Sequence, residues 1–79
     1  MNKVFLIGKI ITEIEFKFII KSKNILIASF KIETLDKQII QIRAYNEIAD
    51  YVYSKFNKND IITIEGKLEE NCVTMVKSI

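Results

Sequence analysis

Apolar and polar side chains alternate along most of this chain, and a helical period interrupts the alternation once. Two segments, 25–34 and 38–45, show the alternation most clearly. Because successive side chains of a β-strand point to opposite faces, the pattern predicts two strands, each with one buried face. The predicted core positions are Leu26, Ala28, Phe30 and Ile32 in the first strand and Ile40, Ile42 and Ala44 in the second.

Other segments are rich in isoleucine, valine and phenylalanine, which suit the pleated surface of a sheet. Strands are predicted at 3–12, 61–69 and 72–79, and residues 15–20 form a short extended continuation of the first. Gly8 lies in the middle of the first strand, where a glycine indicates a bend or a close backbone approach. Lys21 and Lys23 lie in a polar turn at 21–24 and are interpreted as solvated charges.

The helical period follows the strand at 38–45. Asn46 is a suitable N-cap, and Glu47 and Asp50 place negative charge in the first turn. One apolar stripe then recurs at i, i+3, i+4 and i+7, formed by Ala49, Val52, Tyr53 and Phe56. Polar residues 57–60 end the predicted helix.

The predicted order is three strands, one helix and two strands, which makes the fold class all-β. A five-stranded Greek-key barrel with its helix between strands three and four is the arrangement of the OB-fold. Residues 1–79 are expected to form a single such domain, in which the helix plugs one end of the barrel. Other small β-rich folds with one helix share this order, so periodicity alone does not choose between them.

The composition offers little for catalysis or for metal binding. The chain has no histidine, one cysteine and no glycine-rich phosphate loop, so neither an enzyme nor a closed zinc site is expected. The carboxylate pairs Glu13/Glu15 and Glu69/Glu70 lie next to predicted turns, where solvated faces are the usual explanation. No cofactor is expected, and the chain is interpreted as a binding protein.

Charge and hydropathy restrict the partners further. The net charge of +2 is compatible with nucleic acid but only weakly suggestive of it. No run approaches the roughly 20 apolar residues of a membrane helix, and no signal-peptide pattern is present. A cytoplasmic location without membrane contact is therefore expected.

Several runs resemble the bacterial single-stranded DNA-binding proteins. Residues 1–10, MNKVFLIGKI, are similar to the start of that family, and 28–32, ASFKI, resemble its second strand. Residues 44–49 and 64–68, IEGKL, resemble its third-strand end, its helix and its fourth strand at the expected separation. The resemblance covers almost the whole chain and implies an OB barrel that binds single-stranded DNA without strong sequence preference.

The resemblance also implies a set of binding residues. Tyr45 matches a position with a stacking aromatic ring, and Arg43 adds a charge on the same strand face. Side chains at four matching positions approach the DNA backbone in family members, and here they are Lys3, Lys31, Gln41 and Lys58. Ile39 lies on the same face, where many members have tryptophan. RNA is a further possible ligand.

The chain departs from the family in its charges and hairpins. Glu47 stands where a lysine is common, and Glu69 and Glu70 stand where the family has basic residues. The long hairpins after strands two and four are short turns here, and the family's acidic tail is not found. We therefore expect a minimal member, with fewer stacking residues than its relatives.

Phe5 and Ile7 indicate self-association. If Val4 and Leu6 face the core, Phe5 and Ile7 point outward on the first strand, and exposed apolar residues indicate a partner surface. The first strand pairs between subunits in the resembled family, so a homodimer or a homotetramer through this strand is expected. The alternative function is an OB-fold protein-interaction or assembly module, resembling the primosomal proteins, with weak nucleic-acid binding.

Overall fold

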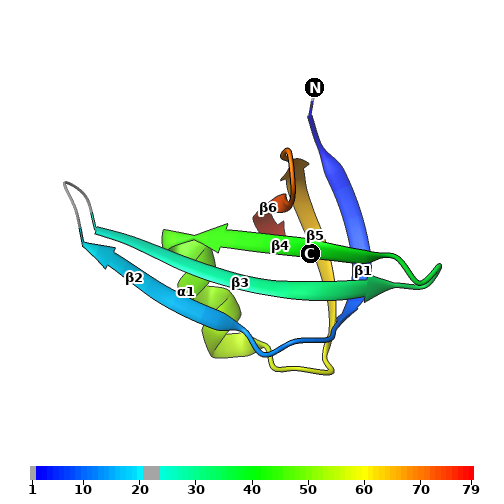
Figure 1. Cartoon of the computed structure of the whole chain (residues 1–79), viewed down its shortest axis with the longest axis horizontal. Coiled ribbons are helices and arrows are strands. Elements are labelled where there is room, and N and C mark those ends of the chain that lie inside the picture. The colour runs from blue at the N-terminus through cyan, green and yellow to red at the C-terminus, as the bar shows by residue number, and fades with distance from the viewer. Residues whose placement is uncertain (1, 21–23) are drawn as a thin grey trace.

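The computed structural model describes residues 2–20 and 24–79 (Figure 1). Its elements are β1 (Val4–Ile10), β2 (Glu15–Ile20), β3 (Asn24–Thr34), β4 (Ile39–Tyr45), α1 (Asn46–Lys55), β5 (Ile61–Leu68) and β6 (Val73–Ser78). The strands form one sheet in the order β1-β5-β6-β4-β3-β2, and β1 also pairs with β3. This pairing closes five strands into a barrel and leaves β2 as an extension along one edge of β3.

The predicted OB barrel with its helix before the last two strands is confirmed, and the strand count differs by one. Residues 3–20 were expected to form one strand with a continuation, but they form β1 and β2, which both pair with β3. The ladder is interrupted between them, where the Lys31 N–H donates to Thr12 Oγ1 at 3.0 Å. A bend is required here because β1 also pairs with β5, whereas β2 pairs with β3 alone among the described residues.

The core follows the alternation seen in the sequence. The predicted inward faces of β3 and β4 are buried, apart from Leu26 and Ile40, which are partly exposed near the strand ends. Leu68 shares a face with the buried Ile64 but is 59% exposed, because it lies at the end of β5. The buried apolar residues are Ile10, Ala28, Phe30, Ile32, Ile42, Ala44, Ala49, Val52, Ile62, Ile64, Val73 and Met75.

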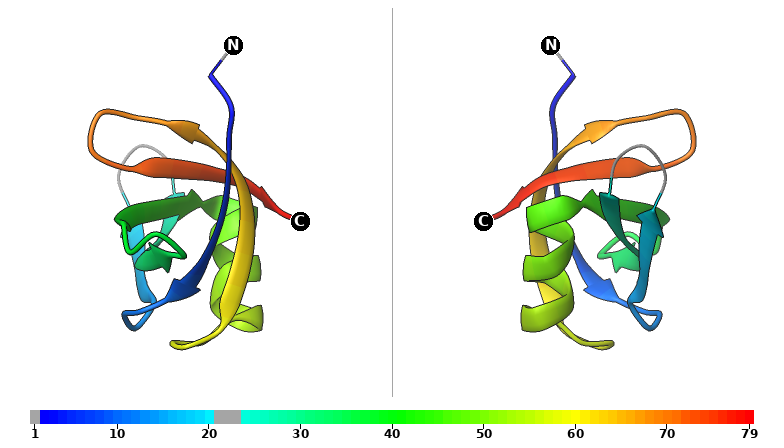
Figure 2. Two further views of the ribbon diagram at one scale, coloured as in Figure 1. Left: turned by 90° about the vertical axis from the view of Figure 1, so that its right-hand side faces the viewer. Right: turned by 90° about the vertical axis from the view of Figure 1, so that its left-hand side faces the viewer.

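Helix α1 packs against β3, β4 and β6, and buries Ala49 and Val52 as predicted (Figure 2). The prediction that Asn46 is the N-cap is wrong. Tyr45 occupies that position without a capping side-chain bond, and Asn46 has a φ of 54°. The Asn46 Oδ1 atom instead accepts the N–H of Leu26 at 3.2 Å. Asparagine tolerates the left-handed region, so this residue turns the chain from strand to helix and satisfies a donor of β3.

Both glycines lie where two backbones come close. A Cβ atom at Gly8 would lie 2.9 Å from the carbonyl oxygen of Glu33, which confirms the predicted close approach. A Cβ atom at Gly66 would lie 2.5 Å from the carbonyl oxygen of Thr74. These positions allow β1 to pass β3 and β5 to pass β6.

Candidate nucleic-acid interface

The outer face of β4 carries the predicted site residues in alternate positions. Ile39, Gln41, Arg43 and Tyr45 point away from the core, since Ile42 and Ala44 between them are fully buried. Ile39 is 57% exposed and Tyr45 is 36% exposed. The strand therefore presents one aromatic ring, one guanidinium group and one aliphatic side chain on the same side of the sheet.

Strand register extends this surface across β3 and β2. Tyr45 pairs with Ile27, and Ile27 pairs with Lys17. The next row joins Arg43 to Ser29 and Glu15, and the row after it joins Gln41 to Lys31. We call this surface the Tyr45 face, defined by Lys17, Lys31, Gln41, Arg43 and Tyr45.

Two exposed cations were missed in the sequence: Lys17 of the Tyr45 face, and Lys67 on β5, which lies outside that definition. Lys17 belongs to β2, and its side could be assigned only once β2 was known to be a separate strand beside β3. Lys67 joins the row of Arg43 through Thr74 of β6. In residues 15–18 the charged Glu15 and Lys17 alternate with Phe16 and Phe18, and this pattern could have identified Lys17 as an outward-facing residue of a strand.

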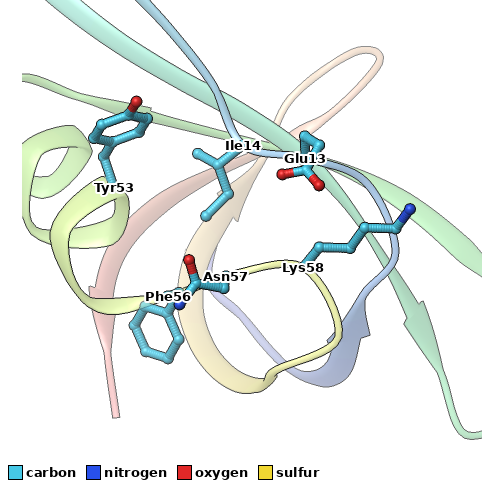
Figure 3. A pocket seen from close by; sticks show the side chains of 6 residues that line it. All are labelled: Glu13, Ile14, Tyr53, Phe56, Asn57 and Lys58. Carbon is cyan, nitrogen blue, oxygen red and sulfur yellow. The ribbon is translucent and has the colours of Figure 1, made fainter.

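Lys58 lies at the end of the barrel, in the connection between α1 and β5. It lines a hollow of about 310 Å³, with Glu13 and Ile14 from the β1–β2 connection and Tyr53, Phe56 and Asn57 (Figure 3). The ring of Tyr53 packs on that of Phe16, with centroids 4.6 Å apart. Glu13 and Lys58 lie together at one side of the hollow, away from Tyr53.

This hollow is the first of three that follow one another over the barrel surface. The central hollow, of about 220 Å³, shares Glu13 with it and is lined further by Thr12, Glu15, Ser29, Phe30, Lys31 and Gln41. A third, of about 230 Å³, shares Gln41 and continues past Ile39 to the β5–β6 turn. We call the three together the furrow. Its lining includes Lys58, Lys31, Gln41 and Ile39.

Acidic side chains outnumber basic ones in the lining of the furrow, which is unfavourable for a phosphate backbone. Glu13 lines the first two hollows, Glu15 lines the second, and Glu69 and Glu70 line the third. Against these four carboxylates the lining supplies the two cations Lys31 and Lys58. Lys17 and Arg43 of the Tyr45 face are not among the residues that line these hollows.

Lys3 lies apart from the Tyr45 face. Its Nζ atom is 3.9 Å from Oε2 of Glu65 on β5, and Lys77 approaches the same carboxylate at 3.7 Å. Two strands, β5 and β6, separate β1 from β4 in the sheet, and β1 meets β3 only from Gly8 onward. The structure thus groups Lys3 with Phe5, on the side of β1 and β5.

Phe5 and Ile7 point outward as predicted, with exposed fractions of 61% and 57%. The turn residues Lys21 and Lys23 lie outside the described residues. Within residues 2–20 and 24–79, no group of three or more acidic, cysteine or histidine side chains is arranged to hold a metal ion. No helix in this part of the chain is long and apolar enough to cross a membrane.

No protein-family model matches the sequence, and no curated protein sequence matches it. The fold is similar to that of the SSB domain of a protein from Synechococcus sp., with a TM-score of 0.88, 13% identity and coverage of 99% of this chain and 93% of the other. The second single-stranded DNA-binding protein of Mycobacterium smegmatis gives a TM-score of 0.73 at 14% identity, over 99% and 83% of the two chains. The dimeric N-terminal domain of PriB from Thermoanaerobacter tencongensis gives 0.68 at 19% identity, over 99% and 96%. These structures confirm the expected fold, the OB barrel of bacterial single-stranded DNA-binding domains.

Proposed function

We propose that this protein binds single-stranded DNA through the Tyr45 face, without strong sequence preference, and that it is not an enzyme. The observation that carries the proposal is the arrangement of Tyr45 and Arg43 on β4 beside Lys17 and Lys31 on the neighbouring strands. Proteins that bind single strands combine an aromatic platform for bases with cations that follow the phosphates. The fold is also that of proteins named for this activity.

Stacking of a base on the Tyr45 ring would supply affinity that does not depend on which of the bases is bound. Every base has a π-face, and stacking on an aromatic side chain contributes about 1–3 kcal/mol per base. Ile39, at the other end of β4, offers an apolar surface about 20 Å away along the strand. With one aromatic ring and one aliphatic contact, the proposed site is weaker than one with several stacked bases.

The test is a titration of fluorescein-labelled oligo-dT, followed by anisotropy at about 20 mM and about 200 mM salt. Each phosphate neutralised on a single strand adds about −0.7 to the slope of log K against log salt, so contacts from Lys17, Lys31 and Arg43 together predict a slope of about −2. Oligo-rU in place of oligo-dT tests RNA as a ligand. No anisotropy change at the lower salt concentration would remove DNA binding as the function.

We further propose that residues 1–79 act as one cytoplasmic domain in DNA replication, recombination or repair, and that two or four copies associate through β1. Among the described residues, the edge of β1 from Val4 to Ile7 has no partner on the side of β3, where pairing starts at Gly8. Phe5 and Ile7 are exposed on the same strand, and Ile61 beside Lys9 is 63% exposed. Burying this apolar surface against a second copy favours association.

A second candidate function is a protein-interaction or assembly module with weak nucleic-acid binding. The observation that favours it is the acidic lining of the furrow, where carboxylates outnumber cations. A specific replication or mobile-element protein captured by the purified chain, together with negligible oligo-dT binding at low salt, would decide for this function.

A further inference from the structure

The side-chain amide of Gln41 has both of its hydrogens engaged within the protein. Its Nε2 atom donates to the carbonyl oxygen of Phe30 at 3.2 Å and to that of Ile42 at 3.3 Å. Both partners only accept hydrogen bonds, so the orientation of the amide is chemically determined. The group that Gln41 has left for a ligand is therefore Oε1, which is an acceptor.

Two carboxylates line the central hollow together with Gln41, beside one ammonium group and the hydroxyls of Thr12 and Ser29. Glu13 and Glu15 contribute carboxylates, and Lys31 is the cation of its lining. A phosphate group carries negative charge and offers acceptor oxygens. It would meet two carboxylates and the Gln41 Oε1 atom there, so the hollow suits a ligand that donates hydrogen bonds.

We propose that the central hollow receives a base with an exocyclic amine, cytosine above all, from the strand bound on the Tyr45 face. This inference rests on the proposed function and adds to it a modest base preference. The N4 amine of cytosine donates hydrogen bonds. It would do so to Gln41 Oε1 and to the carboxylate of Glu15, while the ring acceptors of the base face the Lys31 ammonium group. Uracil has a carbonyl oxygen in place of that amine and an N3–H in place of the cytosine N3 acceptor. In the same pose its oxygen would face acceptors and its N3–H would face the Lys31 ammonium group, so neither would be paired.

The ribose 2′-hydroxyl of RNA is a donor outside the base edge that could also reach these acceptors. Three labelled oligomers of equal length distinguish a donor on the base from a donor on the ribose. Oligo-dC differs from oligo-dU in the base edge, and oligo-rU differs from oligo-dU in the 2′-hydroxyl.

We expect oligo-dC to bind about fivefold more tightly than oligo-dU, and oligo-rU to match oligo-dU. Equal affinities for oligo-dC and oligo-dU would overturn the inference and leave the proposed function standing. Tighter binding of oligo-rU than of oligo-dC would assign the acceptors to the 2′-hydroxyl and also overturn it. If none of the oligomers binds at low salt, the inference and the proposed function both fail.

Two variants assign the preference to this hollow. Gln41→Met removes the acceptor at similar volume, and we expect the ratio of oligo-dC to oligo-dU affinity to fall below about two. Gln38→Met, an exposed glutamine in the β3–β4 turn, is the matched control and should keep the parent ratio. Glu15→Gln changes an exposed side chain and supplies a donor for uracil, so it lowers the ratio without disturbing the core. Its control is Glu33→Gln, outside the central hollow. A parent ratio retained by both Gln41→Met and Glu15→Gln would overturn the assignment.

Discussion

Tyr45 of β4 and Lys17 of β2 lie in one row of the sheet, on either side of Ile27 in β3. Neighbouring strands are about 4.8 Å apart, so the two backbones are separated by about 10 Å across this row. A long lysine side chain spans much of that distance. In the proposed binding mode, a base stacked on Tyr45 would therefore have its phosphate within reach of the Lys17 ammonium group.

Tyr45→Ala should weaken oligo-dT binding about tenfold, because it removes one stacked base worth about 1–3 kcal/mol. The ring is 36% exposed and lies outside the buried core, so the free energy of unfolding should change little. Anisotropy titration measures the binding, and thermal denaturation measures the stability. Tyr51→Ala, which removes a 45% exposed tyrosine from the helix, is the control and should bind as the parent does. Equal affinity for Tyr45→Ala and the parent would take Tyr45 out of the site.

Substituting single cations should show whether DNA contacts the Tyr45 face or another part of the protein surface. Lys17→Gln and Arg43→Gln should each make the slope of log K against log salt less negative by about 0.7, since each loses one phosphate contact. Lys55→Gln, in the last turn of α1, should leave the slope unchanged. Lys3→Gln tests the expectation from the family resemblance. A reduced slope for Lys3→Gln with none for Lys17→Gln would move the DNA path to the side of β1 and β5.

The alternation in β3 and β4 was enough to predict which side chains face the core and which face outward. Phe30 and Ile42 are buried and Arg43 and Tyr45 are exposed because strand geometry alone determines the side on which each residue lies. Pairing between strands depends on contacts that are distant in the sequence. The bend between β1 and β2 follows from barrel closure, so Lys17 could not be placed beside Tyr45 from periodicity.

The start of the helix shows another limit of sequence patterns. Asparagine before an acidic turn is a common N-cap signal, but the Oδ1 atom of Asn46 is used by the N–H of Leu26, which is 20 residues away. Gln41 is similar, because a strand position predicts that it points outward but not that Phe30 and Ile42 take both of its amide hydrogens. Which hydrogen-bonding groups remain for a ligand is decided by the folded neighbours.

Gly66→Ala should destabilise the barrel more than Gly8→Ala. The new methyl group would lie 2.5 Å from the carbonyl oxygen of Thr74 at position 66, against 2.9 Å from that of Glu33 at position 8. Both distances require the backbone to move, and overpacking of this kind costs about 1–3 kcal/mol. For a domain of this size, each 1 kcal/mol lowers the melting temperature by about 4–8 °C. Thermal unfolding followed by circular dichroism gives the order, and a smaller loss at Gly66 would contradict the close approach of β5 and β6.

Phe5→Ser should convert the proposed assembly through β1 to single chains. A phenylalanine that is 61% exposed in the isolated chain contributes apolar area only if a second copy covers it, so its loss weakens association while folding is little affected. Phe18→Ser is the matched control, because Phe18 is 52% exposed on β2, a strand not assigned to the interface. Light scattering coupled to size-exclusion chromatography gives the mass of each variant. If Phe18→Ser dissociates the assembly and Phe5→Ser does not, the copies associate through β2 instead of β1. DNA affinity per chain should be unchanged in Phe5→Ser, since β1 lies on a different side of the barrel from Tyr45.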